Sequence, residues 1–245
     1  MAGSDSCLVA NIAYYLDLEA RHKALLERLE EREESYEARE KVYTGGERVE
    51  RLFVVKQGWF FGYTNLPNGG RHIVNIYNAG DVIGFSSLTL KSYSTNLQAA
   101  TAGRLCPFEK QDLDRIFDES PRLAALLFAL SSREQVVLID TLRVSSRMAP
   151  RARLAFLFLK LIGRLRVTNP DITNRINMPL TQTDMGDAIG VTNVTVSRTI
   201  KRMEQDGLLE RAGKELILHD EAELQNICDY DVRHLEIDTS WFPER

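Results

Sequence analysis

Residues 180–209 read LTQTDMGDAIGVTNVTVSRTIKRMEQDGLL, and this stretch determines how the last third of the chain folds. Thr181 stands where the N-cap of a helix is expected, and Asp184 follows three residues later, as in a capping box. A helical pattern then continues for about two turns. Gly190 tolerates the positive φ that ends such a helix. The stretch therefore begins with a short helix closed by a tight turn.

A second helix is expected directly after this turn. Thr192 is a suitable N-cap, and apolar residues then repeat at near-helical spacing, at Val196, Ile200 and Met203. Two short helices joined by a glycine-containing turn form a helix-turn-helix. Residues 208–218, LLERAGKELIL, read as a hairpin that turns at Gly213, so the segment predicts a winged helix. An ordinary helical hairpin in a protein core is the alternative.

The second helix carries the residues expected to read DNA. Side chains opposite its apolar stripe or near its start are predicted to reach base edges, and these are Asn193, Val194, Ser197 and Arg198. Arg198 offers two donors to O6 and N7 of guanine, whereas Val194 suits a thymine methyl group. The candidates for phosphate contacts, which fix register without reading sequence, are Arg151, Thr181, Thr192, Thr195 and Lys201.

The distribution of charge agrees with a DNA-binding segment although the chain as a whole has a net charge of −4. Residues 143–215 contain 13 basic and 7 acidic side chains. The preceding residues contain 16 basic and 20 acidic side chains, and residues 216–245 contain 2 basic and 8 acidic ones. A basic segment between acidic flanks is an electrostatic footprint for phosphate. A solvated surface with uneven charge is the alternative interpretation.

Short β-rich runs separated by turn signals occupy residues 42–110. The runs include LFVV at 52–55, WFFGY at 59–63 and IVNIY at 73–77. The clearest hairpin turn is PNGG at 67–70, because Asn and Gly tolerate the positive φ of a tight turn. Several short strands at this spacing predict a barrel or sandwich.

Helical patterns flank the β-rich region. Residues 15–41 read as one charged helix, or as a helix followed by an irregular link. A long helix opens at Pro121, and Pro150 marks a break before another helix over residues 151–167. Near-heptad spacing makes one stripe of the long helix a candidate dimer seam rather than a core face, and its members are Leu123, Leu127, Leu130, Val137 and Val144.

The run from about 42 to 220 resembles the CRP/FNR family of bacterial transcription regulators. The similarity rests on LTQTDMGDAIG at 180–190, VSR at 196–198 and GLL at 207–209, and upstream on LFVVKQG at 52–58 and NAGDVIG at 78–84. The resemblance implies an α+β fold in which an N-terminal β-roll of the jelly-roll, cyclic-nucleotide-binding type acts as a sensor. A long central dimerisation helix and a C-terminal winged helix-turn-helix follow.

The resemblance also implies domain boundaries and partners. We expect an N-terminal helix and β-roll at 1–118, a dimerisation helix at 119–147, the DNA-binding domain at 148–220 and an acidic tail at 221–245. The family implies a homodimer that binds double-stranded DNA at a near-palindromic operator and contacts RNA polymerase. Apolar residues of the tail, namely Leu224, Ile227, Trp241 and Phe242, favour a segment that folds back on the protein over a loose one.

The effector of such a regulator is not evident from the sequence. Cyclic-nucleotide members carry Glu directly after the residue equivalent to Gly84 and an Arg-Ser pair later, whereas this chain has Phe85 and, in a gapless alignment, Tyr93. Because a phosphate needs a cation or a helix N-terminus, we expect no cyclic AMP binding by the usual contacts. The alternatives are an unknown small molecule and a pocket that Phe85 fills. Residues that would line this effector pocket are Phe85, Ser86, Ser87, Tyr93 and Ser94.

Other cofactors and activities are not supported. Iron–sulfur members need clustered N-terminal cysteines, and this chain has only Cys7 there; His22 and His72 are weak haem candidates. We therefore expect no cofactor and no metal. The sequence shows no paired carboxylates placed for acid–base catalysis, no GxSxG motif, no P-loop and no metal-ligand spacing, so an enzyme is not expected. The sequence has neither a membrane-spanning stretch nor a signal peptide, which favours the cytoplasm. A sensing or protein-interaction module with a vestigial DNA-binding domain is the alternative function.

Overall fold

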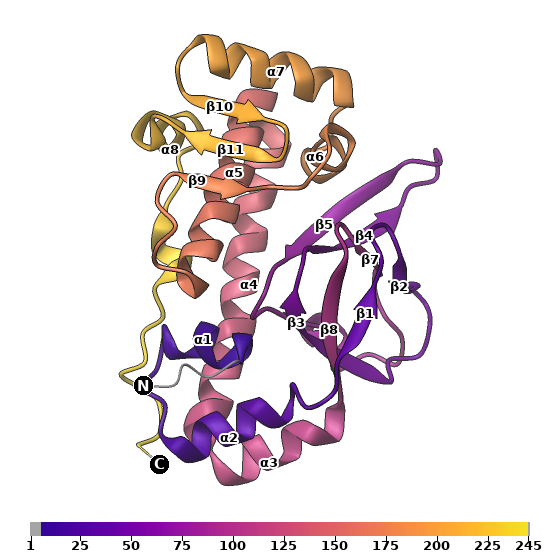
Figure 1. Ribbon diagram of the computed structural model, residues 1–245, viewed down its shortest axis with the longest axis vertical. Coiled ribbons are helices and arrows are strands. Elements are labelled where there is room, and N and C mark those ends of the chain that lie inside the picture. Colours follow the sequence, from indigo (N-terminus) through magenta and orange to yellow (C-terminus); the bar gives the residue numbers. More distant parts are fainter. Residues whose placement is uncertain (1–5, 245) are drawn as a thin grey trace. The chain divides into compact units, whose positions relative to one another are not determined.

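The computed structural model describes residues 6–244 and divides them into two compact units (Figure 1). The first unit comprises residues 6–64, 75–134 and 236–244, and the second comprises residues 65–74 and 135–235. Within the described chain, no helix is both long and apolar enough to cross a membrane.

Two four-stranded antiparallel sheets make up most of the first unit. In one sheet the order is β1 (Glu34–Tyr36), β8 (Gly103–Glu109), β3 (Arg51–Gln57) and β6 (Val82–Ile83). In the other it is β2 (Lys41–Tyr43), β7 (Asn96–Ala99), β4 (Phe60–Asn65) and β5 (Arg71–Tyr77). Their facing side chains form one core cluster that includes Phe53, Phe60 and Leu97. The β-rich runs of the sequence thus form the expected N-terminal β domain.

The N-terminal region does not form the single charged helix that was one expectation for residues 15–41; it is closer to the alternative, a helix followed by a link. It forms two short helices, α1 (Cys7–Ala13) and α2 (Ala20–Arg28), and then strand β1. The helical expectation is wrong beyond Arg28 because Glu34–Tyr36 pairs with β8, in register Glu34 with Leu105. The short helices η1 (Phe85–Ser87), η2 (Lys110–Leu113) and α3 (Asp114–Glu119) complete this part of the chain before α4.

Helix α4 (Pro121–Arg147) is the expected long helix, but it buries the stripe that near-heptad spacing assigned to a dimer seam. Leu123, Leu127, Val137 and Val144 are buried within the protomer, and Leu130 is half-buried. These side chains leave little surface for a partner. The exposed apolar side chains of α4 instead lie on a different stripe, at Phe128, Leu138, Ile139 and Leu142.

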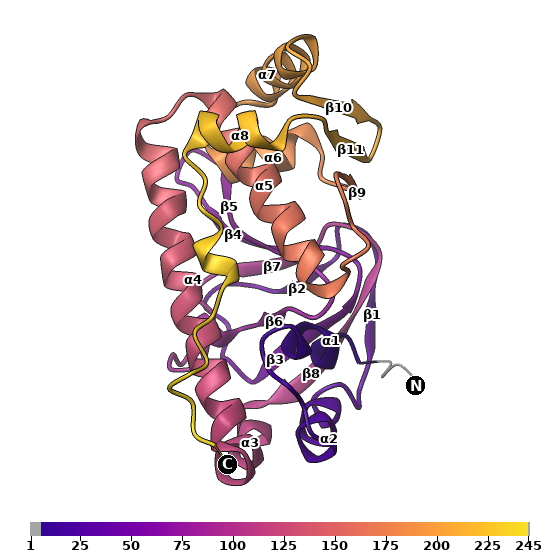
Figure 2. The ribbon, with the colours of Figure 1, turned by 90° about the vertical axis from the view of Figure 1, so that its left-hand side faces the viewer.

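The second unit is built on α5 (Pro150–Thr168), which begins at the expected proline. A three-stranded antiparallel sheet has the order β10 (Leu209–Ala212), β11 (Glu215–Leu218) and β9 (Arg175–Asn177). Helices α6 (Gln182–Ile189) and α7 (Asn193–Gln205) precede the β10–β11 hairpin, so the predicted helix-turn-helix with wing strands is confirmed. Both views of the chain show α7 as the outermost helix of this unit (Figures 1 and 2).

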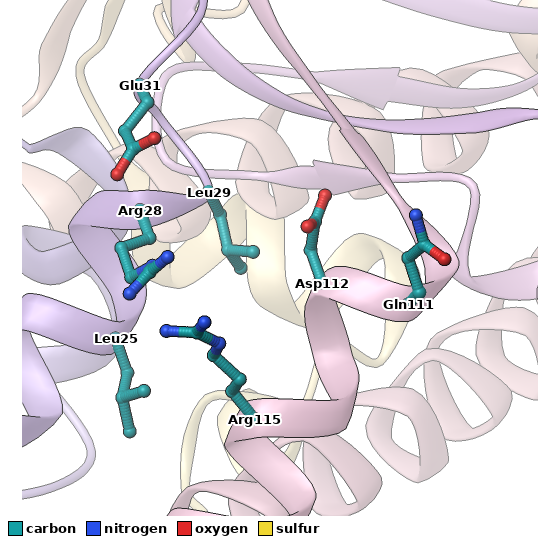
Figure 3. A pocket seen from close by; sticks show the side chains of 7 residues that line it. All are labelled: Leu25, Arg28, Leu29, Glu31, Gln111, Asp112 and Arg115. Atoms are coloured by element: carbon teal, nitrogen blue, oxygen red, sulfur yellow. The ribbon is translucent and has the colours of Figure 1, made fainter.

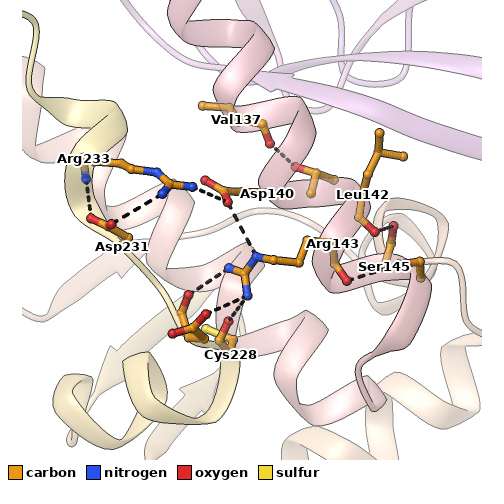
Figure 4. A network of polar contacts seen from close by, with 11 residues as sticks. Val137, Asp140, Leu142, Arg143, Ser145, Cys228, Asp231 and Arg233 are labelled. Carbon is orange, nitrogen blue, oxygen red and sulfur yellow. Dashed lines mark hydrogen bonds and ion pairs between the residues drawn. The ribbon is translucent and has the colours of Figure 1, made fainter.

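The acidic tail folds back on the protein, as its apolar residues indicate. Helix α8 (Glu221–Cys228) buries Leu224 against α5, and η3 (Val232–Leu235) follows. Polar contacts tie this segment to the second half of α4 (Figure 4). Arg143 donates to the backbone oxygen of Asp229 at 2.8 Å, and Arg233 pairs with the buried carboxylate of Asp140 at 3.0 Å. Further along, Phe242 is buried in the core of the first unit, whereas Trp241 is exposed.

Candidate nucleic-acid interface

The start of α6 is fixed by the capping box that the sequence predicts. Asp184 donates its backbone N–H to Thr181 Oγ1 at 3.1 Å, and Thr181 donates its own N–H to Asp184 Oδ2 at 2.9 Å. The helix ends at Gly190, which has a φ of 73°. Gly186 is required by close approach, because a Cβ there would lie 2.6 Å from the carbonyl oxygen of Val191. These local features hold the turn between α6 and α7 tight.

Helix α7 presents one apolar and one polar face. Thr192 caps it by accepting from the N–H of Thr195 at 3.2 Å, and Val196, Ile200 and Met203 are buried. The four predicted base-reading side chains are all exposed, namely Asn193, Val194, Ser197 and Arg198. In the part of the chain that the structure describes, no hydrogen bond or ion pair engages the guanidinium of Arg198. The structure therefore brings these four side chains together on one accessible surface at the start of a helix.

The predicted phosphate contacts divide into two groups. Thr181, Thr192 and Lys201 are exposed beside the helix-turn-helix, and Thr195 is half-buried with its hydroxyl 3.0 Å from that of Thr192. Arg151 instead pairs with Asp206 at the end of α7. Asp206 also lies 3.4 Å from Arg202, so one carboxylate holds two guanidinium groups. The ion pair of Arg151 joins the start of α5 to the end of α7.

Two arginines that the sequence analysis missed hold the ends of α6. Arg153 of α5 donates to the carbonyl oxygen of Ile189 at 3.1 Å. Arg211 of the wing strand β10 donates to the carbonyl oxygen of Leu180 at 2.6 Å. Burial lowers the pKa of the Arg211 guanidinium, with the nearby Glu204 carboxylate acting in the opposite direction. No motif distinguishes these arginines, because their acceptors are backbone atoms far away in sequence.

The predicted effector residues do not gather around one space. Phe85 packs against the core cluster that contains α1 and α2, whereas Tyr93 belongs to the cluster between the two sheets. Tyr93 stacks on Tyr43 with ring centroids 3.7 Å apart, and its hydroxyl donates to the carbonyl oxygen of Arg51 at 2.6 Å. Burial raises the pKa of Tyr93. Aromatic rings therefore fill the interior of the sheet pair at this point.

Two serines of the predicted effector pocket, Ser87 of η1 and Ser94, lie next to each other. The hydroxyl of Ser87 lies 3.5 Å from that of Ser94 and also accepts from the Ser94 backbone N–H at 3.4 Å. Ser87 is buried, and Ser86 and Ser94 are exposed. These contacts close the loop between η1 and β7.

A small pocket of about 100 Å³ lies elsewhere in the first unit (Figure 3). The guanidinium groups of Arg28 and Arg115 face each other in it. None of the predicted effector residues belongs to its lining, which comprises Leu25, Arg28, Leu29, Glu31, Gln111, Asp112 and Arg115. The pocket therefore provides no support for the predicted effector site.

His22 and two cysteines, Cys106 and Cys228, lie in the interior of the protein. His22 is buried, and burial lowers its pKa from the usual value of 6.5. Burial also raises the pKa of Cys106 to about 12 and that of Cys228 to about 11, which keeps both thiols protonated at neutral pH. Over residues 6–244, no group of three or more His, Cys, Asp or Glu side chains is arranged to hold a metal ion.

Comparisons with known proteins agree with this geometry. Residues 33–120 match the cyclic nucleotide-binding domain, and residues 152–227 match the Crp-like helix-turn-helix domain. The chain is 26% identical to Electron transport regulator A of Shewanella oneidensis, over 89% of this chain and 87% of the relative. It is 22% identical to the Fumarate and nitrate reduction regulatory protein of Escherichia coli, over 91% of this chain and 89% of the relative.

A solved structure shows the same fold. The structure of FixK2 from Bradyrhizobium japonicum superposes with a TM-score of 0.71 and 25% sequence identity, covering 80% of this chain and 96% of that chain. The two domain matches occur in the order that the β domain, α4 and the winged helix-turn-helix have here. This chain belongs to the CRP/FNR family of DNA-binding transcription regulators, which are not enzymes.

Proposed function

We propose that the protein is a sequence-specific regulator that reads a near-palindromic operator with the N-terminal half of α7. The observation that carries the proposal is the exposed group of Asn193, Val194, Ser197 and Arg198 at the start of a capped helix. Arg198 has the two donors needed for guanine, and Val194, which is 54% exposed, has an apolar surface for a thymine methyl group. Thr181, Thr192, Thr195 and Lys201 would contact phosphates beside these bases.

The regulator acts as a homodimer through the exposed stripe of α4. Leu138, Ile139 and Leu142 are 57%, 62% and 58% exposed, an unusual density of open aliphatic surface on one helix. Phe128, Gln135 and Leu142 recur every seven residues, and Leu138 lies between the last two at heptad spacing. A second copy of the same helix fits such a stripe. Paired recognition helices would then meet successive major grooves about 34–36 Å apart.

The β domain works without a cyclic nucleotide at the position of Phe85 and Tyr93. Tyr93 occupies its interior through the stack on Tyr43 and the hydrogen bond to Arg51. This supports a regulator that binds its operator in the cytoplasm without a small-molecule effector and then contacts RNA polymerase. The alternative effector is a small molecule held by Ser86 and Ser94 at the exposed side of η1.

Selection from a random duplex DNA pool by the purified protein, at stated salt and without added ligand, tests this function. Recovery of a palindromic motif is the expected result, and it also supports an effector-independent reader. Recovery of no motif, followed by success when cell extract is added, would point to a required effector. Failure under both conditions would favour a sensing or protein-interaction module with a vestigial DNA-binding domain.

A further inference from the structure

Arg71, at the end of the β4–β5 turn, contacts the first helix of the helix-turn-helix. Its Nη2 donates to Asp184 Oδ1 at 2.6 Å, and its Nε donates to Asp187 Oδ2 at 2.6 Å. Both carboxylates belong to α6. Residues 65–74 lie in the same compact unit as the helix-turn-helix, so this contact is internal to that unit. Short bonds between two ionised partners are among the strongest hydrogen bonds in proteins.

Asp184 has a second task besides pairing with Arg71. Its Oδ2 accepts from the backbone N–H of Thr181 at 2.9 Å and from the Thr181 hydroxyl at 2.7 Å, which completes the N-terminal cap of α6. The Asp184 side chain is only 1% exposed. Removal of the cationic partner of a buried carboxylate strongly destabilises the folded protein, because it leaves a buried charge without compensation. The cap of α6 therefore depends on a guanidinium that comes from outside the helix-turn-helix sequence.

Helix α6 is consequently held from three directions. Arg71 holds its acidic side chains, Arg211 of the wing holds the carbonyl oxygen that precedes it, and Arg153 holds the carbonyl oxygen at its end. Arg71 and Asp187 are 24% and 21% exposed, so water competes only partly for their bond. Since α6 packs directly against α7, the position of α6 determines how α7 is presented.

We propose that Arg71 is a positioning residue for DNA recognition, one that orients α6 and thereby α7 without touching DNA. The inference rests on the proposed reading of an operator by α7. Arg71 lies outside the matched helix-turn-helix domain and inside the matched cyclic nucleotide-binding domain. The proposal therefore gives the β4–β5 hairpin a part in DNA sequence recognition. Arg71→Lys keeps one charge but loses the planar fork that reaches two carboxylates, so its effect is expected to lie between those of wild type and Arg71→Ala.

Operator binding by wild type, Arg71→Ala, Arg71→Lys, Asp187→Asn and Arg71→Ala/Asp187→Asn tests the proposal, with the selected operator and a random duplex as probes. Arg71→Ala is expected to raise the operator Kd about tenfold and the random-duplex Kd by less than about twofold. The double variant is expected to bind like Arg71→Ala, because both substitutions break one clamp. Arg104→Ala, which breaks an exposed arginine–carboxylate pair with Glu33, is the matched control and should bind like wild type.

The salt dependence of operator binding separates positioning from phosphate contact. The slope of log K against log salt should be the same in wild type and Arg71→Ala, since Arg71 releases no counterions. A slope reduced by about one would mean that Arg71 contacts phosphate, and this result would overturn the proposal. Unchanged operator affinity in Arg71→Ala and Asp187→Asn would overturn it as well. If Arg71→Ala fails to fold, Arg71→Lys and Asp187→Asn decide the question, whereas absence of operator binding by wild type would refute the proposed function itself.

Discussion

Substitution Ile139→Glu tests whether the exposed stripe of α4 joins two copies of the chain. Ile139 is 62% exposed, and Leu138 and Leu142 lie beside it on the same helix. Glu is a good helix former, so the variant is expected to keep α4 intact while it removes apolar surface from the stripe. The change therefore acts on association and leaves the protomer fold in place.

The magnitude follows from the exposed fraction of the side chain. Complete burial of an Ile side chain contributes about 1.5–3 kcal/mol, and about three fifths of this side chain is available, giving roughly 1–2 kcal/mol per protomer. An isologous dimer contains the contact twice, so the loss is roughly 2–4 kcal/mol. The dimer Kd is then expected to rise roughly 30- to 1000-fold. The uncompensated carboxylate adds to this loss.

Sedimentation equilibrium over a wide range of protein concentration measures this shift. Leu90→Glu is the matched control, because Leu90 is a 44% exposed leucine in the β domain, outside the stripe. A dimer Kd within about threefold of wild type in Ile139→Glu, less than 1 kcal/mol, would refute the assignment of this face. Operator affinity should fall as the dimer dissociates, since each half-site is then bound by a separate protomer.

Three other substitutions test separate parts of the argument. Arg198→Ala should lose about 1–3 kcal/mol of preference for the operator over a random duplex; competition titrations measure this, and equal losses on both duplexes would contradict base reading. Because burial lowers the pKa of His22 below 6.5, the unfolded chain binds the proton more tightly. Stability that is fully present above pH 6.5 should therefore be lost as the pH falls below 6.5 and through the lower pKa of the folded state. Urea unfolding at a series of pH values should show a smaller loss for His22→Gln than for wild type. Tyr93→Ala should lower the free energy of unfolding by about 3–5 kcal/mol, and a loss under 1 kcal/mol would mean that the ring does not fill the interior.

Local features of the binding segment were predictable from the sequence. Thr181 with Asp184, Thr192 and Gly190 act within a few residues of one another, so their types and spacing are enough to place both helices. The exposed face of α7 followed from the positions of its apolar residues. These predictions did not depend on where the rest of the chain lies.

Features that depend on distant partners were not predictable. On α4 two stripes have similar spacing, and only packing within the protomer shows that Val137 and Val144 face inward while Leu138 and Leu142 face outward. The charged residues near Glu34 suit a helix, but pairing with β8 makes them a strand. Arg151 was expected to contact phosphate. Its ion pair with Asp206 could not be foreseen, because the two residues are 55 positions apart in the sequence.

The burial of Phe242 has a consequence for the order in which this protein is made. The same core cluster contains Leu8, Leu26 and Phe242, and the first two residues leave the ribosome long before Phe242. The first unit therefore emerges with a gap in its core that stays open while the whole DNA-binding segment is synthesised. Contacts between such distant parts of a chain form slowly, and the open core exposes apolar surface in the meantime. Deletion of the segment that carries Phe242 would leave this gap in the core open in the finished protein.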